Sequence, residues 1–259
     1  MMIRVASIAL HTFKESVRER VLYNLIAFAL LLIGAAILFG SISVGVEEII
    51  LINLGLSSIS VFGLLMAIFI GIGLVSKEIE RRTIYSILAK PVYRAEFIIG
   101  KYLGLLLTLT TNTAIMTAGF YLALFYQKRS LSFDDLVALE AVYFILLQFA
   151  LVVGLALLFS CISTPILSAV FTFCLYIIGN LLSDIRWFGQ ETGSAVVEKA
   201  TAFFYYLLPN FGNFNAISRV AHGEGIPGYL LLSNSLYALL YVTILLSAAI
   251  LIFEEREFR

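Results

Sequence analysis

Five long stretches without a charged residue constrain the fold of this chain more than any other feature of its sequence. A membrane-spanning helix needs ~20 consecutive, mainly apolar residues. The uncharged stretches cover residues 21–46, 49–76, 102–127, 141–183 and 225–253. Each is therefore long enough to cross a membrane, and the first is too long for the apolar core of a cleaved signal peptide, which has ~7–15 residues.

The fourth stretch is long enough for two helices. Near its middle stands the small polar cluster Ser160-Cys161-Ile162-Ser163-Thr164, followed by Pro165. Proline after such a cluster marks a helix boundary. We therefore predict two helices joined by a tight turn here, and an all-α polytopic membrane protein with six transmembrane helices in a single domain, residues 1–259.

The composition agrees with this class. Hydrophobic residues make up 61% of the chain and charged residues 13%, and the mean hydropathy is +1.01. So few charges cannot cover a soluble surface. The net charge is zero at pH 7, so no overall field favours nucleic acid.

Lysines and arginines are distributed unevenly between the two sides of such a bundle. Residues 1–20, 77–101 and 254–259 together hold twelve of them, whereas the segments on the opposite side hold five. Because cytoplasmic loops are enriched in these residues, we predict that both termini are cytoplasmic and that the protein is a multi-pass component of the cytoplasmic (inner) membrane.

The N-terminal segment, residues 1–20, has the pattern of an amphipathic helix. Its apolar residues Ile3, Ala6, Leu10, Phe13 and Val17 fall on one side at 100° per residue. We predict a cytoplasmic helix at the membrane interface. The pattern fits a general anchor and a more specific role equally well.

The outer loop, residues 184–224, contains a further uncharged stretch at 200–218. We do not interpret it as a seventh span, because Pro209-Asn210 and Gly212-Asn213 would place turn-forming and polar groups in hydrocarbon. The preceding aromatic residues are typical of an interfacial or a re-entrant helix, and the sequence leaves these two open.

The inner loop, residues 77–101, is the most highly charged part of the chain. Its helical pattern places Ile84, Ile87 and Leu88 on one apolar face, and Pro91 ends the helix. A short cytoplasmic helix with an apolar face and a charged rim is typical of a segment that docks into a groove on a partner. The alternative is a loop that only sets the topology.

Several classes of function are disfavoured. The chain has no phosphate-binding loop of the form G-x-x-x-x-G-K-[ST], so it is not itself an ATPase. None of the six predicted spans contains an ionisable residue of the kind that ion-coupled carriers use. The two histidines, His11 and His222, fall on opposite sides of the membrane, which disfavours a metal site. We predict no catalytic, cofactor-binding or metal site.

A few polar residues lie within the predicted spans. They could line a substrate path, or they could form hydrogen bonds between helices, worth ~0.6 kcal/mol each. The candidates for the path are Thr108, Asn112, Gln148 and Asn180.

Four blocks of residues resemble the ABC-2 type permeases, especially the branch that includes the permease accompanying nitrous-oxide-reductase maturation. The most specific block runs from Glu80-Arg81-Arg82-Thr83-Ile84 to Gly100-Lys101. The weaker ones are Phe13-Lys14-Glu15-Ser16-Val17-Arg18, Leu208-Pro209-Asn210 and the terminal Phe253-Glu254-Glu255-Arg256-Glu257-Phe258.

This resemblance implies an exporter subunit that pairs with a second permease copy, identical or different, and docks an ATP-binding-cassette ATPase through the helix after the second span. ATP and Mg would then be bound by that ATPase. A non-transport scaffold and an ion-independent, channel-like protein are the alternatives. The residues that would couple to the ATPase are Glu80, Arg81, Arg82, Thr83, Ile84, Ile87, Leu88, Pro91 and Arg94.

Overall fold

The computed structural model describes residues 2–42, 45–80, 93–130 and 132–255. Six of its helices are long and apolar enough to cross a membrane, which confirms the predicted number of spans and the all-α fold. These helices are α2 (Arg20–Ile42), α3 (Glu47–Glu80), α5 (Arg94–Lys128), α6 (Val137–Ile162), α7 (Pro165–Glu191) and α10 (Gly228–Glu255).

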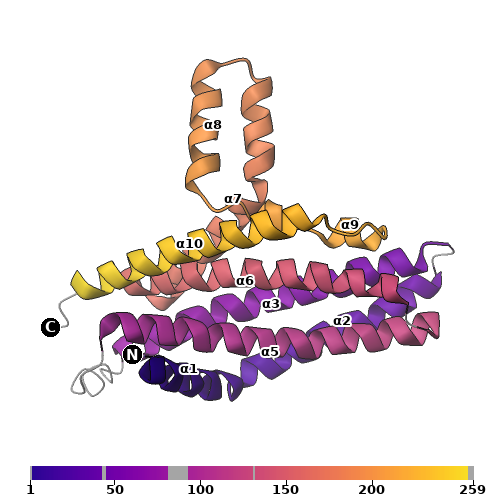
Figure 1. Cartoon of the computed structure of the whole chain (residues 1–259), viewed down its shortest axis with the longest axis horizontal. Helices are drawn as coiled ribbons and strands as arrows, with labels where there is room; N and C mark the ends of the chain where they lie inside the picture. Colours follow the sequence, from indigo (N-terminus) through magenta and orange to yellow (C-terminus); the bar gives the residue numbers. More distant parts are fainter. Residues whose placement is uncertain (1, 43–44, 81–92, 131, 256–259) are drawn as a thin grey trace.

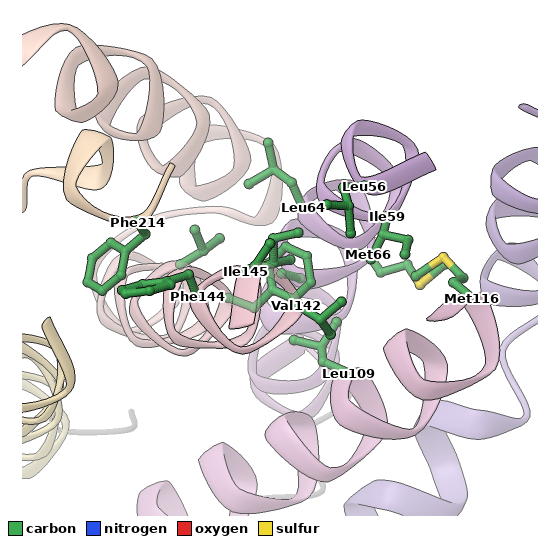
Figure 2. Close-up of a cluster of buried hydrophobic side chains, with 14 of the residues drawn as sticks. Leu56, Ile59, Leu64, Met66, Leu109, Met116, Val142, Phe144, Ile145 and Phe214 are labelled. Carbon is green, nitrogen blue, oxygen red and sulfur yellow. The ribbon is translucent and has the colours of Figure 1, made fainter. Parts of the chain in front are cut away.

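Helices α3 and α6 form the centre of the bundle. In each, 67% of the most apolar window is buried, compared with 22% in α2 and α7 and 28% in α10. Large side chains from α3, α5, α6 and the short helix η2 (Phe211–Phe214) interlock in this core, among them Leu56, Met66, Met116 and Phe144 (Figure 2). The three peripheral helices therefore present most of their apolar surface outward.

The predicted division of the fourth uncharged stretch is confirmed. Helix α6 ends at Ile162 and α7 begins at Pro165, where proline is well tolerated because the first backbone N–H of a helix has no intrahelical partner. The hydroxyl of Ser168 donates to the backbone oxygen of Thr164 at 2.9 Å. The turn between the two helices is therefore short and held by local hydrogen bonds.

Two helices extend beyond the uncharged stretches that predicted them. Helix α3 continues to Glu80, and α5 begins at Arg94, so both ends of the predicted inner loop 77–101 are helical. Charged residues are acceptable at these helix ends because Arg94, Glu96 and Lys101 have polar partners on other elements or on the backbone.

The N-terminal helix α1 (Met2–Val17) packs along the first part of α5. The buried side chains of α1 are the small polar residues Thr12 and Ser16, and Thr12 lies against Gly104 of α5. The predicted apolar face points elsewhere, since Ile3 is 87% exposed and Leu10 52% exposed. Small residues permit close helix packing inside a membrane protein, whereas large apolar residues can face lipid.

A helical pair projects sideways from the bundle (Figure 1). It consists of the C-terminal part of α7 and of α8 (Ala195–Leu207). Helix α7 continues to Glu191, well past residue 183, so the predicted outer loop 184–224 begins inside a helix. With 13 residues, α8 is too short to span a membrane, as we predicted when rejecting a seventh span.

The N-terminus and the C-terminus lie at the same end of the bundle (Figure 1). We call this the terminal end; it carries α1, the first turns of α5 and the last turns of α10. The opposite, or far, end carries η1 (Phe133–Leu136) and α9 (Ile217–Ala221).

Candidate functional site

Most of the predicted ATPase-coupling residues lie outside the described residues. Glu80 is the last residue of α3, and its side chain is not among those described, whereas Arg94 is the first residue of α5. The others lie in the segment 81–92: Arg81, Arg82, Thr83, Ile84, Ile87, Leu88 and Pro91. The structure therefore describes the two helices that flank this segment, α3 before it and α5 after it.

Arg94 connects the start of α5 to the end of α10. Its Nη1 donates to the backbone oxygen of Phe253 at 2.8 Å and to that of Glu254 at 2.6 Å. Carbonyl groups in the last turn of a helix have no intrahelical partner and carry partial negative charge. Arg94 thus acts as a C-terminal cap for α10, although it lies about 160 positions earlier in the sequence.

Glu96 and Lys101 connect α5 to α1. The buried carboxylate of Glu96 lies 3.9 Å from the guanidinium of Arg4 and accepts the backbone N–H of Tyr93 at 3.4 Å. The buried ammonium of Lys101 lies 3.9 Å from the carboxylate of Glu15. Buried charges are stable only with such partners, so these pairs fix how α1 sits on α5.

Gly100 and Gly104 allow α1 and α5 to approach closely. A Cβ at position 104 would lie 2.5 Å from the backbone oxygen of Ala9 and 2.6 Å from the Cβ of Thr12. The spacing Gly100-Lys-Tyr-Leu-Gly104 is the small-xxx-small pattern of close helix pairs in membranes.

A small apolar cluster completes the terminal end. The rings of Phe97 on α5 and Phe253 on α10 stack with centroids 5.8 Å apart. Cys161 at the end of α6 and Ala249 on α10 are buried in the same cluster. The first turns of α5 are therefore joined to α1, α6 and α10, the elements that would feel any displacement of the preceding segment.

The candidate substrate-path residues fall into two groups. In α5, the hydroxyl of Thr108 donates to Gly104 at 2.9 Å, and the amide of Asn112 lies 3.6 Å from the sulfur of Met66 on α3. In the other group, Gln148 of α6 donates to the hydroxyl of Tyr176 at 3.0 Å, and Asn180 donates to the backbone oxygen of Tyr176 at 2.9 Å.

Tyr176 thus joins Gln148 and Asn180 at the contact of α6 with α7, and the sequence pattern did not identify it. The other two candidates belong to α5 and do not share these partners. Among the described contacts, all four side chains make hydrogen bonds to helix backbone or to a neighbouring helix.

The Leu208-Pro209-Asn210 block anchors the base of the projecting helical pair. The buried Asn210 donates its backbone N–H to the hydroxyl of Tyr237 at 2.8 Å, and its side chain accepts from Gly212 at 3.0 Å. The hydroxyl of Tyr241 donates to the backbone oxygen of Leu208 at 3.3 Å. Two tyrosines of α10 therefore hold the point where α8 ends.

Gly179 makes this attachment possible. A Cβ there would lie 2.5 Å from the backbone oxygen of Pro209 and would also collide with the ring of Phe211. Since α7 carries no side chain at this position, the chain after α8 can return to the bundle in direct contact with the α7 backbone.

The six helices that are long and apolar enough to cross a membrane agree with the comparison with known families. The family model described as ABC-2 family transporter protein matches residues 6–258. The chain belongs to the ABC-2 transporter family. It is therefore a multi-pass membrane protein and a permease component of an ABC transporter.

The family match extends over all the elements described above except the first four residues of α1. No curated protein matches the chain. Assignment to the nitrous-oxide-reductase-maturation branch stays a prediction.

Proposed function

We propose that this ABC-2 permease is the membrane-spanning subunit of an exporter that is driven by a separate ATP-binding-cassette ATPase. The proposal places it in the cytoplasmic membrane with both termini, and hence the terminal end of the bundle, in the cytoplasm. ATP and Mg would be bound by the ATPase, because the chain has no phosphate-binding loop of its own.

One observation carries this proposal. The first turns of α5 directly follow the segment 81–92 and are tied to α10 by Arg94 and to α1 by Glu96 and Lys101. Coupling between distant sites requires contiguous packed elements. A displacement of the segment 81–92 by the ATPase would be transmitted to α1 and α10 through these contacts of α5.

In this proposal, residues 82–89 form the coupling helix. Ile84, Ile87 and Leu88 insert into a groove on the ATPase, and Glu80 and Arg81 face the charged rim of that groove. The resemblance placed Arg94 among the residues that would couple to the ATPase. Its hydrogen bonds to α10 support an internal role instead, as the residue that transmits movement of the segment to the last helix.

The partners in this proposal include a second permease copy. Helices α2, α7 and α10 leave most of their apolar windows unburied within one chain, which supports an assembly in which part of that surface meets another subunit. Native mass spectrometry of the detergent-solubilised complex should show two permeases and two ATPases. A single permease with ATP-driven transport would refute the pairing.

The coupling assignment is tested with Leu88→Asp, measured by copurification of the ATPase. A buried interface anchor contributes ~2 kcal/mol or more on truncation, so the variant should lose at least about thirtyfold in ATPase affinity. Arg81→Ala is the matched control in the same segment, because an exposed rim pair contributes only ~0–1 kcal/mol.

Both variants should insert normally, since both positions fall outside the uncharged stretches that predict the spans. If Leu88→Asp protein binds the ATPase as tightly as the unmodified protein, the segment does not dock the ATPase and acts only as a topology signal.

A further inference from the structure

A groove lies between the junction of α1 with α2 and the last part of the α3 span. Its volume is about 410 Å³, within the range of ~300–1,000 Å³ that is usual for small-molecule sites. Apolar side chains form most of its wall, namely Val21 and Leu22 on one side and Phe69 and Ile70 on the other. We call it the α1–α2 groove.

One wall of this groove carries a buried polar group without a partner. The hydroxyl of Ser16 is fully buried and makes no hydrogen bond within the described structure, and Ser16 lines the groove. A buried donor without an acceptor is unfavourable. A ligand in the groove that offers an oxygen acceptor would satisfy it.

The position of the groove indicates which ligand this is. The uncharged stretch in α2 begins at Val21 and the one in α3 ends at Ser76, and the groove adjoins both of these ends, so it sits where hydrocarbon meets the headgroup layer. Arg18 and Arg20 are exposed at the α1–α2 junction, and guanidinium groups suit phosphate. Glu19 also lines the groove, so its carboxylate lies beside the same opening.

We propose that the α1–α2 groove binds one phospholipid molecule. Its acyl chain lies against Val21, Leu22, Phe69 and Ile70, and a glycerol-ester oxygen accepts the hydrogen bond of Ser16. Its phosphate lies near Arg18 and Arg20.

A protein helix suits the groove less well than a lipid. A helix with its side chains is ~10–12 Å across and rises ~5.4 Å per turn, so about one turn would fill the whole volume. Stable docking of a helix needs several turns in contact, whereas an acyl chain is narrow enough to follow the groove.

The test uses the purified full-length chain in detergent and phosphatidylglycerol with a photoreactive diazirine on one acyl chain. After illumination, mass spectrometry of the peptides should find the label in residues 16–22 and 69–73. An excess of unlabelled phosphatidylglycerol should abolish this labelling, because a specific site holds one molecule.

Matched variants sharpen the result. Val21→Trp fills the groove and should reduce the labelling at least about tenfold, whereas Val61→Trp, at an equally exposed position of α3 (53% against 50%), should not change it. Ser16→Ala should reduce lipid affinity about three- to tenfold. Thr12→Ala should leave it unchanged, because Thr12 is equally buried and unpartnered but packs against Gly104.

The proposal is overturned if the label spreads evenly over exposed apolar positions such as Phe28 and Ile244, or if it is absent from both groove segments of the unmodified chain. These outcomes do not depend on whether any variant folds. They are also independent of the ATPase, which is absent from the experiment, so the lipid site and the transport function are tested separately.

Discussion

The guanidinium of Arg94 donates a 2.8 Å hydrogen bond to the backbone oxygen of Phe253 and thereby joins the first residue of α5 to the last turns of α10. The residue follows directly on the segment proposed to meet the ATPase. A side chain that could have faced a partner therefore completes the end of a helix in its own chain.

Arg94→Ala should destabilise the isolated permease. Hydrogen bonds to a charged group contribute ~1.5–3 kcal/mol, and the partial exposure of Arg94 places the expected loss near the lower end. The measurement is thermal unfolding in detergent without the ATPase, with Lys14→Ala, an exposed position of α1, as control. Unchanged stability together with weaker ATPase binding would show instead that Arg94 contacts the ATPase.

Gly104→Ala should loosen the packing of α1 on α5. The added methyl group would meet the backbone oxygen of Ala9 at 2.5 Å, and backbone atoms cannot move aside without shifting the helix. Such overpacking destabilises by ~1–3 kcal/mol. Gly34→Ala is the control, because a Cβ there meets no atom within 4 Å. Equal melting temperatures for the two variants would show that the close approach is not required.

Tyr237→Phe should weaken the attachment of the projecting helical pair. It removes the only oxygen that the structure shows accepting the buried backbone N–H of Asn210, and an unsatisfied buried donor costs ~1–3 kcal/mol. Tyr229→Phe, at an exposed position of the same helix, should be neutral. Hydrogen exchange localises the effect: amides of α8 and of residues 210–215 should exchange faster in Tyr237→Phe alone, and unchanged exchange there would contradict the prediction.

Cysteine labelling tests the orientation in intact cells. Cys161 is buried but Cys174 is exposed, so the background is Cys174→Ser. A membrane-impermeant reagent should modify Ser130→Cys from outside and should reach Glu257→Cys only after the cells are opened. The reverse pattern would invert the topology and place the terminal end outside.

The sequence predicted the spans well, because a run of apolar residues has few other uses in a membrane protein. The small polar cluster followed by Pro165 was sufficient to divide the longest run correctly. The ends of α3 and α5 were predicted less well. Charged residues were interpreted as loop, yet Arg94, Glu96 and Lys101 are helical, because each has partners in α1 or α10 that are distant in sequence.

The packing face of α1 could not be derived from apolar periodicity. Apolar periodicity predicted the face that α1 turns to the membrane interface, and it carries no information on the opposite face, which packs on α5. Thr12 and Ile8 make the contact with Gly104 and Gly100 instead. The signal that could have revealed it was the glycine spacing at Gly100 and Gly104, on the other helix.

The tyrosines were missed for a related reason. A tyrosine within a span has a large apolar ring, so Tyr176 and Tyr237 do not stand out as polar residues, and only the structure shows that their hydroxyls bind Gln148 and Asn210. Sequence alone identified the polar residues within the spans but not these partners.

The central position of α3 and α6 has a consequence for how the chain is made. The two helices pack against each other, but α3 is synthesised first, and α6 is complete only at residue 162 of 259. Until then, the inner face of α3 has no partner other than lipid, α2 and α5. The bundle core can therefore close only late in translation, after the ribosome has delivered four of the six spans to the membrane.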